Sequence, residues 1–246
     1  MENIVEVHSL SKKYDNFQLS DINFHIKKGR IVGLIGQNGN GKTTLIKCLL
    51  NIIHFKGKVS FFGKDMKERE KEIKEYIGIV FDDMPFDDIL NARDLSIIMR
   101  SIYKSWSQDT FFQYLDKYNL KQKQSFKSYS KGMKTKLMLA VALSHDAKVL
   151  ILDEPTSGLD PIFRTEILNE LKLYVEEGDR AVLFSTHITS DLEQIADDII
   201  FVHNGKIVFS GSKEEMLELK DVESTVCSID NSMINILKGI NNDSGN

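Results

Sequence analysis

The sequence predicts an α/β fold built on a mainly parallel sheet, with an antiparallel β subdomain near the N-terminus and an inserted α-helical subdomain. Residues 31–35, 149–152 and 181–185 are almost continuously apolar, which is typical of strands buried on both faces of a parallel sheet. Shorter apolar runs near the N-terminus indicate antiparallel strands. Between about residues 88 and 144 no strand pattern occurs, and apolar residues recur at helical spacing.

The remaining strands are predicted from runs rich in apolar and β-branched residues. They cover residues 4–7, 19–26, 59–62, 77–81, 199–202 and 207–209. Helical patterns separate several of these runs. Asn204 and Gly205 lie between the last two runs and favour a type I′ hairpin turn, because both residues tolerate positive φ. We therefore expect an antiparallel hairpin after the last buried strands.

The helical subdomain is expected over about residues 88–144. Its apolar residues fall into two groups at helical spacing: Leu95, Ile98, Met99 and Ile102, then Phe111, Phe112, Leu115 and Tyr118. We expect these side chains to form core rather than a ligand site. The chain is divided into a main domain over residues 1–220 and a C-terminal extension over residues 221–246. The extension predicts either a short strand and a helix or a partly disordered end.

Composition excludes several classes of protein. The 246 residues carry 32 Lys and Arg against 36 Asp and Glu, a formal net charge of -4, whereas broad capture of nucleic acid needs a basic surface. We therefore expect no nucleic-acid partner. No apolar run is long enough to cross a bilayer, and the N-terminus lacks the apolar core of a signal peptide. Cys48 and Cys227 make no disulfide framework. These features favour the reducing cytosol.

A glycine-rich segment joins the buried run at residues 31–35 to the helical pattern LIKCLLNII. It matches G-x-x-x-x-G-K-[ST] in the strand–loop–helix setting that this phosphate-binding motif requires. Its glycines allow successive backbone N–H groups to point inward at the positive end of the helix. Lys42 is expected to contact the β- and γ-phosphates, and Thr43 to ligate Mg²⁺. The residues expected to hold the nucleotide are Gly36, Gln37, Asn38, Gly39, Asn40, Gly41, Lys42, Thr43 and Thr44.

Two adjacent carboxylates end the buried run at residues 149–152. The run places Asp153 at the C-terminal edge of the sheet, beside the phosphate loop, where we expect it to hold Mg²⁺ directly or through water. Glu154 is expected to polarise the attacking water, since a general base must lie near the γ-phosphate but off the metal. An isolated Asp-Glu pair would indicate only a solvated strand end, but its combination with a phosphate loop favours catalysis.

The order of three motifs makes the chain resemble the ATP-binding subunits of ATP-binding cassette (ABC) transporters over about residues 5–219. These motifs are YSKGM before a helix, then LILDEPTSGLD, then a strand that ends in STH. Phosphate loops occur in many NTPases, but this family joins them to a Ser-Gly signature and a switch histidine in this order. The resemblance implies the ABC ATPase fold with a P-loop NTPase core, and ATP with Mg²⁺ as cofactors.

The resemblance also assigns roles within the chain's own ATP site. Tyr14 stands where the family stacks an aromatic ring on adenine, and the alternative is a tyrosine that packs on its own sheet. His187 matches the switch histidine that contacts the γ-phosphate. The expected catalytic residues are therefore Glu154, His187 and Lys42.

Other motifs imply a second chain. Ser130, Lys131 and Gly132 align with the signature, which in the family binds the γ-phosphate held by the other protomer. Asp160 of the SGLD segment would lie at the shared interface. The resemblance therefore implies a head-to-tail dimer that sandwiches two ATP molecules, formed with a second copy or with a different cassette subunit.

Two residues depart from the family pattern. Lys131 replaces the first glycine of the signature, where its cation either strengthens the phosphate contact or faces solvent. Asp82 stands where the family usually has Gln. We expect Asp82 to ligate Mg²⁺, although a carboxylate cannot donate a hydrogen bond as an amide does.

The implied function is ATP binding and hydrolysis that drive a separate integral membrane permease from the cytoplasmic face of the membrane. YSKGM followed by basic residues resembles cassettes of ABC-2-type exporters, including those for peptide and antibiotic efflux. The helical subdomain and residues 82–90 would dock the permease. One alternative is a soluble regulatory or assembly ATPase without transport. Another is a nucleotide-binding module without turnover, which the presence of Glu154 and His187 opposes.

Overall fold

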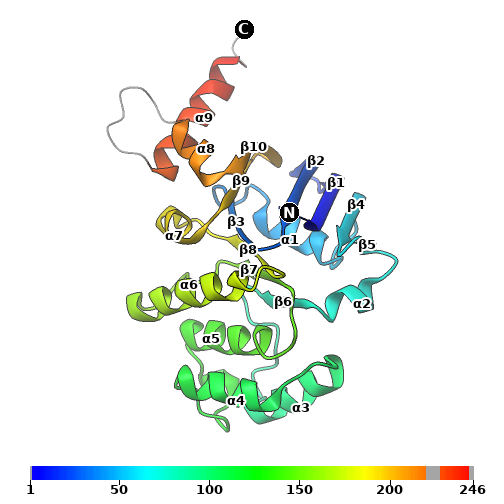
Figure 1. The fold of residues 1–246 in the computed structure, drawn as a ribbon, viewed down its shortest axis with the longest axis vertical. Coiled ribbons are helices and arrows are strands. Elements are labelled where there is room, and N and C mark those ends of the chain that lie inside the picture. The colour runs from blue at the N-terminus through cyan, green and yellow to red at the C-terminus, as the bar shows by residue number, and fades with distance from the viewer. Residues whose placement is uncertain (1, 220–227, 244–246) are drawn as a thin grey trace.

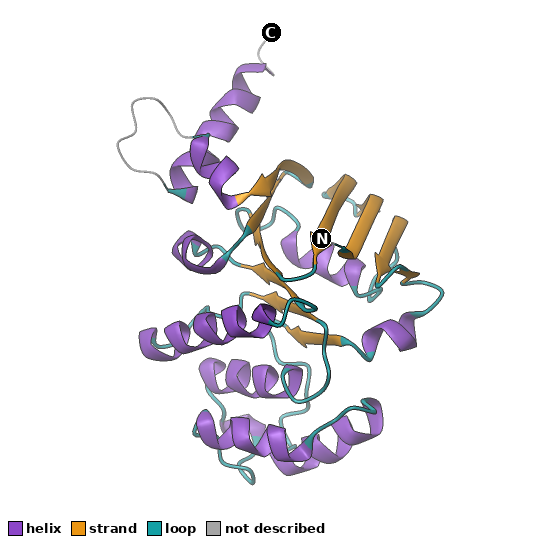
Figure 2. Ribbon diagram, in the orientation of Figure 1, coloured by secondary structure: helices purple, strands orange, loops and turns teal. Residues whose placement is uncertain are grey.

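The strands form two sheets that lie side by side (Figure 2). The computed structural model describes residues 2–219 and 228–243. One sheet is antiparallel and has the order β2-β1-β4-β5. Its strands are β1 (Asn3–Lys13), β2 (Gln18–Lys27), β4 (Lys56–Phe61) and β5 (Lys64–Asp65). This sheet confirms the antiparallel strands predicted near the N-terminus, and the two-residue strand β5 was not foreseen from the sequence.

The second sheet forms the centre of the molecule and has the order β10-β9-β3-β8-β7-β6. Its strands are β3 (Arg30–Ile35), β6 (Ile77–Val80), β7 (Val149–Asp153), β8 (Ala181–Ser185), β9 (Asp198–His203) and β10 (Lys206–Ser212). All neighbouring pairs are parallel except β9 and β10. The turn between these two confirms the predicted hairpin, because Asn204 and Gly205 adopt φ of 47° and 72°.

Most of the helices cover one face of the central sheet and enclose its lower end in the view of Figure 1, whereas α1 lies on the other face, towards the antiparallel sheet. They are α1 (Lys42–Leu49), α2 (Glu70–Lys74), α3 (Ala92–Ile102), α4 (Gln108–Lys117), α5 (Lys131–Ala142), α6 (Pro161–Glu176), α7 (Thr189–Ile195), α8 (Lys213–Glu218) and α9 (Ile229–Asp243), with one 3₁₀ turn (Phe126–Ser128). Helices α3, α4 and α5 fill the predicted helical region. Of its predicted core side chains, Ile98 and Ile102 are instead 38% and 55% exposed, whereas five others are buried: Leu95, Met99, Phe111, Leu115 and Tyr118. Asn91, Ser107 and Ser130 begin these three helices by accepting hydrogen bonds from backbone N–H groups.

The hydrophobic core lies on both faces of the central sheet. Leu152 and Phe184 pack into the cluster formed with the helices, whereas Ile151 and Leu183 pack into the cluster formed with the antiparallel sheet and α1. This alternation along fully buried strands explains why they show almost no polar residues in the sequence. The sheet is therefore a rigid support for the loops at its carboxyl edge.

The C-terminal extension contains helix α9, which lies beside α7 and α8 (Figure 1). The Ile229 N–H donates to Glu193 Oε1 at 2.8 Å, and Thr189 Oγ1 donates to Asp230 Oδ2 at 3.0 Å. The predicted helix is thus present, while residues 220–227 and 244–246 lie outside the described residues. The division between main domain and extension stays a prediction.

Candidate functional site

The loop between β3 and α1 encloses a cavity of about 500 Å³. Its walls are Phe17, Gln37, Asn38, Gly39, Gly41, Lys42, Thr43, Thr44, Asp82 and Glu154. Gly41 begins α1 with φ of 106°, and a Cβ there would lie 2.6 Å from Phe17 Cζ, so only glycine fits. No side chain caps α1 and its first turn carries no acidic residue. The N–H groups at this helix terminus therefore face the cavity as anion donors.

Lys42 places a buried cation at the base of this cavity. Its Nζ donates to the Gly36 carbonyl oxygen at 2.7 Å and lies 3.8 Å from Glu154 Oε1. Burial lowers the pKa of Lys42, and the charges of Glu154 and Asp153 oppose that shift. A phosphate in the cavity would supply the further negative charge that a desolvated ammonium needs.

Asp153 and Thr43 have the chemistry expected of a magnesium site. Thr43 Oγ1 donates to Asp153 Oδ2 at 2.8 Å. Asp153 is 1% exposed, and its Oδ1 has no hydrogen-bond partner within the described part of the chain. A buried carboxylate oxygen without a donor is costly unless a cation lies beside it. In the described part of the chain, no three His, Cys, Asp or Glu side chains lie close enough together to hold a metal ion. Mg²⁺ would therefore also need phosphate and water oxygens, as it usually does.

Glu154 is held in an unusual backbone conformation that faces it towards Lys42. Its φ is 53°, a region that residues other than glycine seldom adopt and that costs about 1–3 kcal/mol. The Glu154 N–H donates to the Ser185 carbonyl oxygen at 2.9 Å. Its Oε2 lies 2.7 Å from His187 Nδ1. The structure thus brings together three predicted catalytic residues that are far apart in the sequence.

An aromatic residue that the sequence reasoning missed lies beside the phosphate loop. Phe17 lines the cavity, whereas Tyr14 is not among the lining residues and is 44% exposed. Lys12 Nζ lies 4.9 Å above the Tyr14 ring. Both aromatics belong to the loop between β1 and β2, so the signal was present, but spacing alone could not rank them. The role of Tyr14 stays a prediction, with Phe17 as a second candidate for adenine stacking.

The signature residues lie outside the walls of this cavity. Ser130 Oγ accepts the Met133 N–H at 3.3 Å and so begins α5. A Cβ at Gly132 would lie 3.6 Å from Leu159 Cδ2, which places the signature beside the SGLD loop. Asp160 Oδ1 accepts the Phe163 N–H at 3.0 Å and begins α6. These groups are therefore separate from the phosphate loop of their own chain.

Lys131 is the signature residue that reaches towards the cavity. Its Nζ donates to Asp82 Oδ1 at 2.6 Å, and Asp82 is one of the cavity walls. The two residues that depart from the family pattern thus form an ion pair with each other. Lys131 is therefore ion-paired while its side chain stays 51% exposed, and a contact between Lys131 and phosphate stays a prediction.

Asn40 and Thr156, which do not line the cavity, hold the surrounding loops by hydrogen bonds. Asn40 Oδ1 accepts the Asn204 N–H at 3.2 Å, which joins the phosphate loop to the β9–β10 turn. Thr156 Oγ1 donates to Asp191 Oδ2 at 2.7 Å, and Arg164 pairs with the same carboxylate at 2.6 Å. These bonds tie the segment after Glu154 to helix α7, which follows His187.

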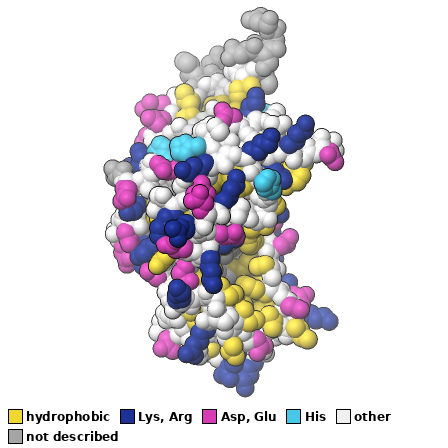
Figure 3. All heavy atoms as spheres, turned by 90° about the vertical axis from the view of Figure 1, so that its right-hand side faces the viewer, with side chains coloured by type: hydrophobic (Ala, Val, Ile, Leu, Met, Phe, Trp, Pro, Cys, Tyr) yellow, Lys and Arg dark blue, Asp and Glu magenta, His cyan; other side chains and the backbone are white. Residues whose placement is uncertain are grey.

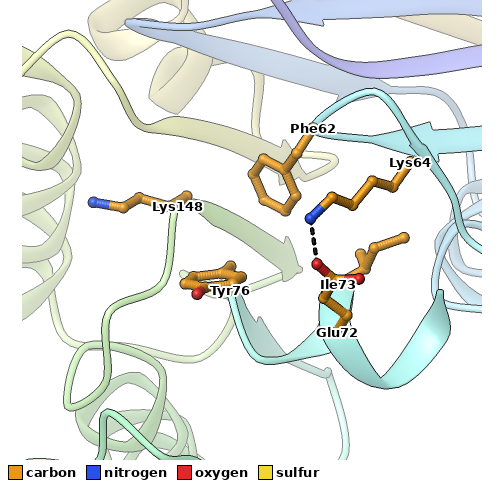
Figure 4. A pocket seen from close by; sticks show the side chains of 6 residues that line it. All are labelled: Phe62, Lys64, Glu72, Ile73, Tyr76 and Lys148. Atoms are coloured by element: carbon orange, nitrogen blue, oxygen red, sulfur yellow. Dashed lines mark hydrogen bonds and ion pairs between the residues drawn. The ribbon is translucent and has the colours of Figure 1, made fainter.

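A second, smaller cavity of about 190 Å³ lies between the β4–β5 hairpin, α2 and the residues that precede β6 and β7 (Figure 4). The rings of Phe62 and Tyr76 meet edge to face across it, with centroids 6.0 Å apart. Lys64 binds Glu72 at its rim, and Lys148 points away from the cavity. None of the predicted site residues lines it. The cavity at the phosphate loop, which the predicted residues line, is therefore the candidate nucleotide site.

Comparison with known proteins places these features in a family. The model of a family described as ABC transporter matches residues 19–157. The bacitracin transport ATP-binding protein BcrA of Enterococcus faecalis is 34% identical over 212 residues, which cover 85% of this chain and 69% of BcrA. The lantibiotic transport ATP-binding protein SrtF of Streptococcus pyogenes is 34% identical over 209 residues, which cover 83% of this chain and 89% of SrtF.

A solved structure agrees with the fold. The ATP-binding subunit of an ABC transporter superposes with a TM-score of 0.85 at 24% identity, covering 95% of this chain and 99% of that one. This likeness confirms the predicted arrangement of a mainly parallel core, an antiparallel sheet and an inserted helical region.

Proposed function

The chain belongs to the ATP-binding subunits of ABC transporters, which bind and hydrolyse ATP, and we propose that it powers a separate membrane permease. The observation that carries the ATPase part is the junction at Glu154, where one carboxylate lies between Lys42 Nζ and the His187 ring. Lys42 would bind the β- and γ-phosphates, and Glu154 would accept the proton of the attacking water. His187 would contact both Glu154 and the γ-phosphate and so orient them relative to each other.

Mg²⁺ fits the residues at the edge of the cavity. Thr43 and Asp153 would hold it, and Asp82 lines the same cavity. When bound, Mg²⁺ neutralises charge that develops on the phosphate oxygens. The chain's own contribution is to orient those ligands, since the Thr43–Asp153 hydrogen bond already sets the direction of both side chains.

We assign the signature to a second copy of the chain. Each copy carries a phosphate loop, and its signature lies outside the walls of its own nucleotide cavity, so two copies arranged head to tail would complete two sites. An isologous pair of this kind is the commonest symmetry among oligomers. Ser130 and Gly132 would then bind the γ-phosphate of the partner's ATP, with Asp160 near the twofold axis.

The permease would dock on the helical end of the molecule. Ile89, Ile97 and Ile102 are 79%, 71% and 55% exposed, and Figure 3 shows hydrophobic side chains gathered on the lower half of that face. A groove of about 570 Å³ lies alongside, between α2 and the end of α3. Large exposed apolar residues of this kind mark interaction surfaces. The chain would thus work at the cytoplasmic face of the membrane. Among the residues that the structure describes, no helix is long and apolar enough to span a bilayer.

The exported compound is proposed from the relatives. BcrA and SrtF are named for transport of bacitracin and of a lantibiotic. We therefore propose export of a peptide, an antibiotic or another hydrophobic compound.

Co-purification tests the transport part of the proposal. The tagged chain, purified from detergent-solubilised membranes of its native host, is expected to bring with it a polytopic membrane protein. Ile97→Asp should abolish this, because a charge would be buried in the interface. Leu173→Asp is the matched control, since Leu173 is 63% exposed on α6 and should leave the complex intact. Finding no membrane partner, with ATPase activity unchanged by membranes, would instead support the regulatory or assembly ATPase.

A further inference from the structure

Lys131 and Asp82 join two parts of the chain that would belong to different ATP sites in the proposed dimer. Lys131 is the first residue of α5, and Asp82 follows β6. Their charged atoms are 2.6 Å apart, and the two side chains are 51% and 49% exposed. Asp82 lines the chain's own nucleotide cavity, while the signature that contains Lys131 would serve the partner's nucleotide.

The charges around the start of α5 explain why this pair forms. A cation at the start of a helix is unfavourable, because the helix N-terminus already carries partial positive charge. The first turn of α5 contains no acidic residue that would offset Lys131. The Asp82 carboxylate supplies that negative charge from outside the helix. A γ-phosphate at the signature would supply the same charge and make stronger charge-assisted bonds.

We propose that the Lys131–Asp82 ion pair restrains the signature until the chain's own pocket is loaded. The proposal rests on the head-to-tail dimer described above. When ATP and its accompanying cation enter the pocket, that cation competes for Asp82 and frees Lys131. Lys131 then binds the γ-phosphate held by the partner. Loading one pocket thereby prepares the signature for the other, and the coupling acts equally in both directions because binding linkage is reciprocal.

The expected coupling is small but measurable. Exposed ion pairs change equilibria by about 1.5- to 5-fold and weaken with salt. A second pair on the same helix provides a control: Lys134 Nζ lies 3.2 Å from Asp88 Oδ1, and Asp88 is not among the walls of the nucleotide cavity. Because these four side chains lie at the surface, their substitution leaves the buried core intact.

A double-mutant cycle tests the proposal. In the Glu154→Gln background, light scattering would give the concentration of ATP with Mg²⁺ that produces half-maximal dimer. When Lys131 is present, Asp82→Asn removes both the ion pair and a candidate metal ligand. When Lys131→Met has already removed the ion pair, Asp82→Asn removes only the metal ligand. We expect Asp82→Asn to raise the midpoint about 1.5- to 5-fold less when Lys131 is present than when Met replaces it. This difference should shrink in high salt.

The outcomes separate this proposal from the proposed function. Equal effects of Asp82→Asn with and without Lys131 would overturn the restraint while leaving the ATP-dependent dimer standing. The same difference in the control cycle of Asp88→Asn and Lys134→Met would also overturn it, because it would show a general charge effect. If no protein dimerises with ATP, the background included, the dimer itself is wrong and the restraint fails with it.

Discussion

The phosphate-loop side and the signature side of the molecule differ in how far one chain completes them. On the first side Lys42 and Asp153 are buried and held by Gly36, Glu154 and Thr43. On the second side Ser130 and Lys131 are exposed, and their hydrogen bonds serve helix α5 and Asp82. One side is preorganised for ATP within the chain. The other is an exposed surface which, in the proposed dimer, would receive its phosphate from the partner.

Removal of the general base should have the largest effect on the preorganised side. Glu154→Gln is expected to lower the hydrolysis rate about 100- to 10,000-fold, because an amide cannot accept the proton of water. ATP binding should persist, since Lys42 and the loop N–H groups remain. Single-turnover hydrolysis and nucleotide titration measure the two effects separately. Hydrolysis at the parent rate would show that Glu154 is not the base.

A buried histidine between the helical region and the core should make the fold sensitive to acid. His145 stacks on Tyr103 with ring centroids 3.9 Å apart, and burial lowers its pKa from 6.5 to about 4, against the opposing charges of Glu75 and Asp146. As pH falls, His145 therefore binds its proton at a higher pH in the unfolded chain than in the folded chain. Stability due to neutral His145 is complete above pH 6.5 and is lost as pH falls towards 4.

The comparison with His145→Phe isolates this effect, because phenylalanine keeps the stacked ring but does not titrate. Between about pH 8 and about pH 4, the parent should lose about 3 kcal/mol more unfolding free energy than the variant. Urea unfolding at both pH values measures the difference. Parallel losses in the two proteins would mean that His145 is not held neutral.

Loss of the buried Lys42 cation should weaken nucleotide binding. Lys42→Ala is expected to raise the dissociation constant for ATP about 10- to 100-fold, the usual range for a lost charge-assisted bond. Lys47→Ala is the control, because Lys47 is an exposed lysine on the same helix. Calorimetric titration distinguishes them, and equal affinities of Lys42→Ala and the parent would contradict the assignment.

The smallest expected effect concerns Asp160, which has a structural as well as a proposed interface role. Asp160→Ala removes the hydrogen bond to the Phe163 N–H and should cost about 1 kcal/mol of stability, whereas Asp160→Asn retains an oxygen at that position. Thermal unfolding measures both variants. An equal loss in both would assign the stability to the charge of Asp160 rather than to its hydrogen bond.

Local sequence patterns predicted the phosphate loop and the strand ends because both depend on residues that are close together in the sequence. Gly41 is required by its own φ, and Asp153 follows directly from the end of a continuous apolar run. The helical region likewise followed from spacing along the chain. These features depend on neighbours within a few residues, so one sequence contains the information.

The topology of a parallel sheet placed Asp153 beside the phosphate loop, but other contacts between distant segments could not be predicted from the sequence. Phe17 lines the cavity only because the β1–β2 loop folds over Gly41, and the Lys131–Asp82 pair joins residues 49 positions apart. The His145 stack depends on where α3 ends against the loop after α5. Such pairs depend on the packing angle between subdomains, which periodicity does not report.

Complementation between two inactive variants tests most directly whether each chain supplies half of its partner's site. Lys42→Ala disables the phosphate loop. Gly132→Glu places a carboxylate at the signature, where a Cβ meets only ordinary contacts, so the fold should persist. Mixed in equal amounts, the two inactive proteins should recover ATPase activity of up to about a quarter of the parent value, because half of the dimers contain one intact composite site. Activity no higher than the sum of the separate variants would contradict the account.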